Sequence, residues 1–96
     1  MPKTLEECRS EIDAIDQQII ALFEAHMMVS KDVADYKFHH DMAIFNPERE
    51  QQVLENRVAL LNDKNYTVLT RTFMQTIMDL SKEVQKRYLE TLKIKP

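Results

Sequence analysis

Residues 5–37 read LEECRSEIDAIDQQIIALFEAHMMVSKDVADYK, and this stretch decides the fold. Its apolar residues are spaced alternately by three and four positions, which is the pattern of a helix that contacts another helix along its whole length. No Gly or Pro occurs between Lys3 and Asn46, so the pattern predicts one continuous helix over residues 5–37. We call this row of residues the seam, and His26 is its polar member. The other members are Leu5, Cys8, Ile12, Ile15, Ile19, Leu22, Val29, Val33 and Tyr36.

This helix is longer than the globule that a chain of this size forms. A helix of about 33 residues is roughly 50 Å long. A compact chain of 96 residues has a radius of gyration of only about 12.5 Å. Two shorter helices of the same chain can cover part of the seam, but a second copy is the simplest way to bury the rest. We therefore expect an intertwined helical homodimer.

The composition supports an all-α fold and argues against several classes of protein. The sequence has no Gly and three Pro, whereas hairpins and sandwiches need turn glycines. The net charge is −3 and the 13 Lys and Arg residues are scattered, which argues against a nucleic-acid surface. No apolar run is long enough to cross a membrane. The single Cys8 favours a reduced, cytoplasmic setting, and residues 1–96 are expected to form one helical domain.

Two further helices follow the first. Thr4 is placed to cap the first helix, and Asn46 followed by Pro47 marks the start of the second. The second helix is expected to end at the turn cluster 62–65, and the third to cover residues 67–92. The intervening stretch 38–45 is predicted to be a loop with Ile44 or Phe45 buried.

The adjacent His39 and His40 in this loop raise the possibility of a metal site. Neighbouring side chains diverge, however, and no further ligand occurs at a suitable spacing. We interpret both as solvent-exposed histidines and predict no metal site.

Polar residues that fall on inward helix faces are the candidates for function. His26 lies in the seam, and Lys37 lies eleven residues later on nearly the same face. Arg9 is four heptads before Lys37, so an antiparallel partner can bring its own Arg9 beside this Lys37. The remaining candidates are Ser81 and Gln85 on the third helix, and Arg49 and Glu50 at the start of the second. The competing interpretation is structural, because such residues usually extend along apolar surface or are solvated.

The order and spacing of these residues resemble those of the all-helical, AroQ-class chorismate mutases over nearly the whole chain. The matching segments are Leu5-Glu6-Glu7-Cys8-Arg9 with Ile12-Asp13-Ala14-Ile15-Asp16, Val33-Ala34-Asp35-Tyr36-Lys37, Asn46-Pro47-Glu48-Arg49-Glu50 and Ile77-Met78-Asp79-Leu80-Ser81-Lys82-Glu83-Val84-Gln85.

The resemblance implies an entwined dimer that rearranges chorismate, a dianion, to prephenate without a cofactor. It assigns Lys37 and Gln85 as donors to the ether oxygen, and Glu50 with the Asn46 region as the partner of the ring hydroxyl. It assigns a carboxylate of the substrate to Arg9 from the other subunit, with Ser81 assisting and Arg49 close by.

Two positions depart from the family pattern. His26 stands where the family usually has a second carboxylate-binding Arg, and Asn46 stands where it has Asp. Loss of one charge-assisted contact costs about 1.5–3 kcal/mol. Two alternatives follow: an isochorismate pyruvate-lyase of the same fold, against which Glu50 argues, and a catalytically weak mutase-like module that only dimerises or regulates a partner.

Overall fold

The computed structural model describes residues 2–94. Within this range the chain forms three α-helices and one short 3₁₀ helix: α1 (Leu5–His39), α2 (Pro47–Ala59), η1 (Lys64–Tyr66) and α3 (Thr67–Ile94). No strand occurs among these residues. The prediction of an all-α chain with three helices and a very long first helix is confirmed.

Helix α1 is continuous over 35 residues, which corresponds to about 52 Å. It begins after Thr4, whose Oγ1 accepts a hydrogen bond from the backbone N–H of Glu7 at 3.1 Å. It ends two residues later than the sequence pattern indicated, so the prediction that Phe38 and His39 lie in the loop is wrong. The reason is that no residue of this segment prevents helical geometry, and the end of an apolar pattern does not by itself end a helix.

Helix α2 begins where its cap predicts, and α3 begins at the predicted residue, Thr67. The Oδ1 atom of Asn46 accepts a hydrogen bond from the backbone N–H of Arg49 at 3.1 Å, and Pro47 occupies the first helical position. Helix α2 ends at Ala59, before the predicted turn, and η1 occupies part of that turn. Helix α3 extends two residues beyond its predicted end.

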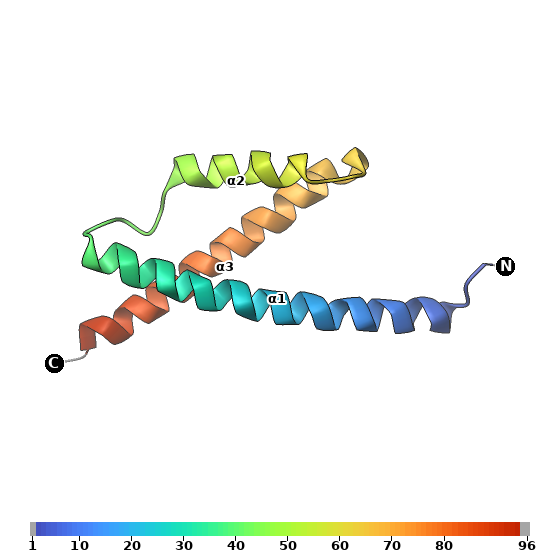
Figure 1. The fold of residues 1–96 in the computed structure, drawn as a ribbon, viewed down its shortest axis with the longest axis horizontal. Helices are drawn as coiled ribbons and strands as arrows, with labels where there is room; N and C mark the ends of the chain where they lie inside the picture. Colours follow the sequence, from blue (N-terminus) through green and yellow to red (C-terminus); the bar gives the residue numbers. More distant parts are fainter. Residues whose placement is uncertain (1, 95–96) are drawn as a thin grey trace.

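The three helices form an open and elongated arrangement (Figure 1). Helices α1 and α2 both pack on α3, and α2 runs back in the direction opposite to α1. The N-terminal half of α1 lies apart from the other two helices, and its first turns extend beyond them. The principal extents are 63 × 28 × 14 Å and the radius of gyration is 17.3 Å, well above the value for a compact chain of this length.

The apolar core within one chain is small. Met27, Ala34 and Val53 are its buried apolar side chains in the described part of the chain. By contrast, Ile12 and Ile15 of the seam are each 54% exposed and Ile19 is 46% exposed. Ile44 in the loop is half-buried, whereas Phe45 is exposed. The N-terminal half of the seam therefore has no cover from its own chain. None of the helices described is both long and apolar enough to cross a membrane.

Candidate active site

A groove of about 610 Å³ lies between α1 and α2, with α3 as its floor. Seven of the eight site residues predicted from the sequence line this groove, although they come from all three helices. They are His26, Lys37, Asn46, Arg49, Glu50, Ser81 and Gln85. The groove is thus of a size that binds small molecules. The individual roles assigned to these residues stay predictions.

Lys37 stands at the closed end of the groove, where α1 turns into the loop. Its Nζ donates a hydrogen bond to the backbone carbonyl of Ile44 at 2.9 Å. The loop folds back because the backbone N–H groups of His40 and Met42 both donate to the carbonyl of Lys37, at 3.3 and 2.9 Å. Asp41 between them has a φ of 54°, in the left-handed region that commonly ends a helix. The loop therefore holds the ammonium group of Lys37 in a defined position.

A chain of buried polar side chains crosses from α3 to α1. Ser30 donates to the backbone carbonyl of His26 at 2.9 Å and lies 2.6 Å from the Oγ of Ser81. Because the single hydroxyl proton of Ser30 is used by His26, Ser81 must donate to Ser30. The Nε2 of Gln85 then donates to the Oγ of Ser81 at 3.1 Å. This order keeps the second N–H of the Gln85 amide available, and its Oε1 has no partner among the described residues.

Glu50 is the carboxylate of the groove, and it is ion-paired. Its Oε2 lies 2.8 Å from the Nζ of Lys82, and its Oε1 accepts a hydrogen bond from Gln75 at 3.2 Å. The side chains of Lys82 and Glu50 are only 23% and 17% exposed. The hydrogen bond to Glu50 is the main reason why the pKa of Lys82 is raised, with a further contribution from Asp79. Lys82 also lies over the ring of Phe45, 4.6 Å from its centroid.

Asn46 and Arg49 line the groove, but the side chain of each also makes a hydrogen bond at α2. The Oδ1 of Asn46 caps the helix, so this atom already accepts one hydrogen bond. The Nη1 of Arg49 donates to the Oε1 of Gln52 at 2.9 Å along the exposed side of the helix. Both residues can therefore offer only part of their hydrogen-bonding groups to a ligand.

Charge distinguishes the groove from the rest of the chain. Four permanent cations line it, namely Lys37, Arg49, Arg57 and Lys82, against the single carboxylate of Glu50. The chain as a whole carries a net charge of −3. Opposite signs in the groove and on the chain indicate a site for an anion, because the cations attract it and the remaining surface does not.

Arg9 is the predicted site residue that the groove of its own chain does not include. It lies in the exposed N-terminal part of α1, 28 residues before Lys37. At 1.5 Å per residue this corresponds to about 42 Å along the helix. Leu22, the groove residue nearest to Arg9 along α1, is still 13 residues or about 20 Å away, so Arg9 cannot reach the groove of the same chain.

Metal binding finds no support in the described part of the chain, where no three His, Cys, Asp or Glu side chains come together. His40 donates from Nδ1 to the backbone carbonyl of Tyr36 at 2.7 Å, and His39 lies 3.6 Å from a carboxylate oxygen of Asp35.

Comparison with known proteins identifies the family. The family model described as "Chorismate mutase type II" matches residues 8–86. The chain belongs to the chorismate mutase type II family.

Among curated relatives, the "Chorismate mutase" of Methanocaldococcus jannaschii is 32% identical over 91 residues, which cover 94% of this chain and 92% of that protein. The "Bifunctional chorismate mutase/prephenate dehydratase" of Aquifex aeolicus is 28% identical over 94 residues, which cover 88% of this chain and 26% of that protein. The "T-protein" of Haemophilus influenzae is 36% identical over 55 residues, 57% of this chain and 15% of that protein. The chain thus spans only a minor part of the latter two. No solved structure gives a significant match.

Three polar groove residues of this chorismate mutase family member were not among the predicted site residues: Ser30, Arg57 and Lys82. Spacing contained a signal for each of them. Ser30 is one helical turn after His26, Arg57 is seven residues after Glu50, and Lys82 is three residues before Gln85. Their orientation depends on how α2 and α3 pack, which the motif comparison did not include.

Proposed function

We propose that this chain catalyses the Claisen rearrangement of chorismate to prephenate in the groove described above. The observation that carries the proposal is the groove's excess of cations over carboxylates in a chain that is acidic overall. Chorismate is a dianion with two carboxylates, a ring hydroxyl and an ether oxygen. Such a ligand needs several cations, one acceptor for the hydroxyl and donors for the ether, and the groove contains all three kinds of group.

The chemistry asks little of the protein beyond position and electrostatics. In the rearrangement one C–O bond breaks and one C–C bond forms within the same molecule, so no electron or proton passes to the enzyme. Negative charge grows on the ether oxygen as the C–O bond breaks. A fixed cation or N–H group directed at that oxygen stabilises the transition state more than the ground state.

Lys37 and Gln85 are our candidates for these donors. The ammonium group of Lys37 is positioned by the carbonyl of Ile44, and the serine chain leaves one N–H of Gln85 available. Preorganisation of this kind lowers the barrier, because the donors need no rearrangement during the reaction.

The remaining assignments follow the resemblance. Glu50, held by Lys82 and Gln75, is the acceptor for the ring hydroxyl, with Asn46 beside it. His26 contacts a carboxylate of the substrate, and Arg49 lies close by. Ser81 gives its proton to Ser30 and assists by accepting the hydrogen bond that orients the Gln85 amide. A cytoplasmic location stays a prediction from composition.

We also propose that the site requires a second copy of the chain. The exposed N-terminal half of the seam has the apolar surface that a homodimer would bury. In an antiparallel pair the partner's Arg9 would come close to Lys37 of this chain and add another cation for a carboxylate. The unit that folds and functions is then a dimer of single chorismate-mutase-like domains.

A direct assay tests the proposal. The purified protein is incubated with chorismate, the loss of chorismate absorbance is followed, and prephenate is identified by mass spectrometry. A parallel incubation with isochorismate tests for released pyruvate. Enzyme-dependent formation of prephenate supports the proposal. Release of pyruvate from isochorismate without any prephenate indicates the lyase, and no turnover of either compound indicates a non-catalytic module; each of these results would overturn it.

A further inference from the structure

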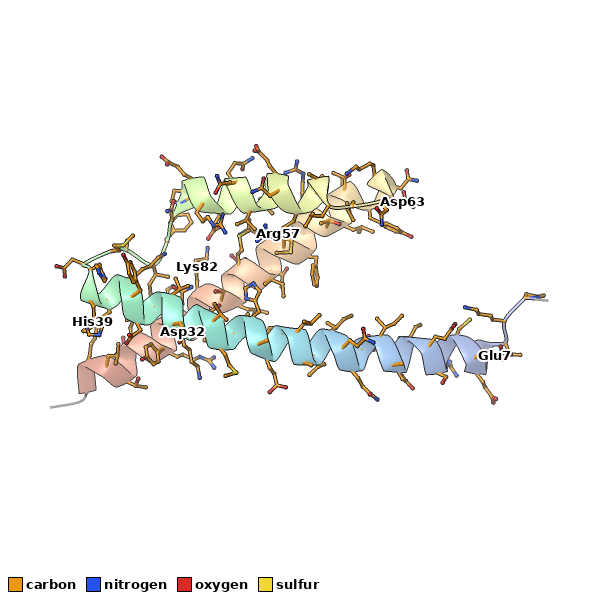
Figure 2. All side chains as sticks on the ribbon, in the orientation of Figure 1. Glu7, Asp32, His39, Arg57, Asp63 and Lys82 are labelled. Atoms are coloured by element: carbon orange, nitrogen blue, oxygen red, sulfur yellow. The ribbon has the colours of Figure 1, made fainter. Side chains whose placement is uncertain are left out.

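Arg57 belongs to the face of α2 that lines the groove. Asn46, Glu50, Val53 and Arg57 are separated by four, three and four residues, so they share one side of the helix, and all four line the groove. Figure 2 shows Arg57 directed away from α2 into the space between α2 and α1. The residue is half-buried.

The guanidinium group of Arg57 has no hydrogen bond or ion pair with any residue of the range 2–94. The ion pairs of that range involve other cations, such as Lys82 with Glu50 and Arg87 with Glu83. A cation that is partly withdrawn from water and lacks an anion is unfavourable unless a ligand supplies one.

Arg57 and His26 lie at the same level of the groove on opposite sides. The loop 40–46 joins the C-terminal end of α1 to the N-terminal end of α2, and the two helices are antiparallel, so both extend to the same side of this loop (Figure 1). His26 precedes Lys37 by eleven residues, and Arg57 follows Asn46 by eleven residues. Each interval corresponds to about 16 Å of helix. Both residues therefore stand at the end of the groove opposite to Lys37.

We propose that Arg57 is a substrate-binding residue that supplies, from α2, the permanent cation for the second carboxylate of the ligand. The inference rests on the proposed function. In the family pattern an Arg on α1 occupies the position of His26, and histidine is charged only when protonated. A guanidinium group stays charged at all relevant pH values and binds a carboxylate through two parallel N–H groups. A cation from the opposite helix thus compensates for the one that α1 lacks.

The proposal predicts an exchange between the two positions. Arg57→Ala should lower kcat/KM for chorismate about tenfold to a hundredfold, mainly through a higher KM, because a carboxylate contact is present in both ground and transition states. Arg57→Lys should lose less. The double variant His26→Arg with Arg57→Ala should regain most of the lost kcat/KM, since the cation returns to the same level of the groove. Arg87→Ala, at an exposed arginine of α3 outside the groove, is the matched control.

A pH series separates binding from folding. Around His26 the charged groups of the groove are Lys37 on α1, Arg49, Glu50 and Arg57 on α2, and Lys82 on α3. A histidine supplies positive charge only when it is protonated, so with Arg57 removed kcat/KM should fall more steeply with rising pH than it does in the wild type.

Each result decides the proposal. Circular dichroism and light scattering first establish that every variant keeps its helix content and its oligomeric state. If the wild type converts chorismate and Arg57→Ala keeps its kcat/KM, Arg57 is not a ligand, although the proposed function stands. If Arg57→Ala loses activity by dissociating or unfolding, and His26→Arg does not restore it, Arg57 is a structural residue and the proposal is wrong. A wild type that does not convert chorismate refutes the proposed function and this inference together.

Discussion

The proposed dimer can be tested at one residue of the seam, Ile15. Its side chain is 54% exposed in the single chain and lies in the part of α1 that α2 and α3 do not cover. Ile15→Glu places a carboxylate where the dimer would enclose an apolar group. We expect this variant to be largely unfolded rather than a folded monomer.

The expected magnitude follows from exposure and symmetry. Complete burial of an isoleucine side chain contributes about 1.5–3 kcal/mol, so burial of its exposed half contributes about 1 kcal/mol in each copy. Enclosing an unpaired carboxylate costs several kcal/mol more in each copy. The dissociation constant should then rise by more than about a thousandfold, because each 1.4 kcal/mol is a factor of ten. The separated chain keeps only a small apolar core, centred on Met27, Ala34 and Val53, which does not hold three helices together.

Light scattering and far-UV circular dichroism measure the outcome over a range of protein concentrations. The control is Gln17→Glu, which adds the same charge two residues away, on the opposite side of α1. The control should keep the mass and helix content of the wild type. A folded, monomeric Ile15→Glu variant that still converts chorismate would contradict both the dimer and the contribution of Arg9 across the interface.

Two further predictions concern the two lysines of the groove. Lys37→Ala should lower kcat about a hundredfold to a thousandfold with a smaller change in KM, because the ether oxygen gains its charge only in the transition state. The control is Lys31→Ala, at an exposed position of α1. Nearly intact turnover of Lys37→Ala would place the catalytic donor elsewhere. Lys82→Met should reduce the free energy of unfolding by about 1–3 kcal/mol at neutral pH, since it removes the partner of Glu50. The pKa of Lys82 is raised in the folded state, so its contribution is complete below the unfolded pKa of about 10.4 and is lost as the pH rises through the folded value. The difference between wild type and Lys82→Met in urea unfolding should therefore shrink above about pH 10.4, and a difference that stays constant there would mean that the ion pair with Glu50 does not stabilise the fold.

The helices could be predicted from the sequence because their signals are local. The alternating spacing of the seam, the cap of Thr4 and the Asn46-Pro47 pair each act within one or two turns, and the structure confirms all three. The predicted positions of the helix ends were less accurate. The first helix continues through His39 because no breaker stops it there, and such continuation depends on how the loop closes on Lys37 rather than on local pattern.

The composition of the groove was only partly predictable, for a different reason. Motif spacing identified residues that match a family pattern, and seven of them do lie together. It could not identify Lys82 or Arg57, because their inclusion depends on the way α2 and α3 pack. Ser30 lies one helical turn after His26 but was not among the predicted site residues. Its contact with Ser81 joins two residues 51 positions apart, which requires the tertiary structure.

Glu50 explains how one acceptor can exist among so many cations. A ring hydroxyl needs a hydrogen-bond acceptor, whereas the two carboxylates of the ligand need positive charge. A free carboxylate in this groove would repel the dianion that the other residues attract. Lys82 offsets the charge of Glu50 at 2.8 Å, and Gln75 occupies one of its oxygen atoms at 3.2 Å, so the carboxylate keeps an acceptor site while its negative charge is largely neutralised. The loss of Lys82 should therefore weaken binding of the dianion and also destabilise the fold. The KM of Lys82→Met for chorismate measures the first effect, and its urea unfolding measures the second.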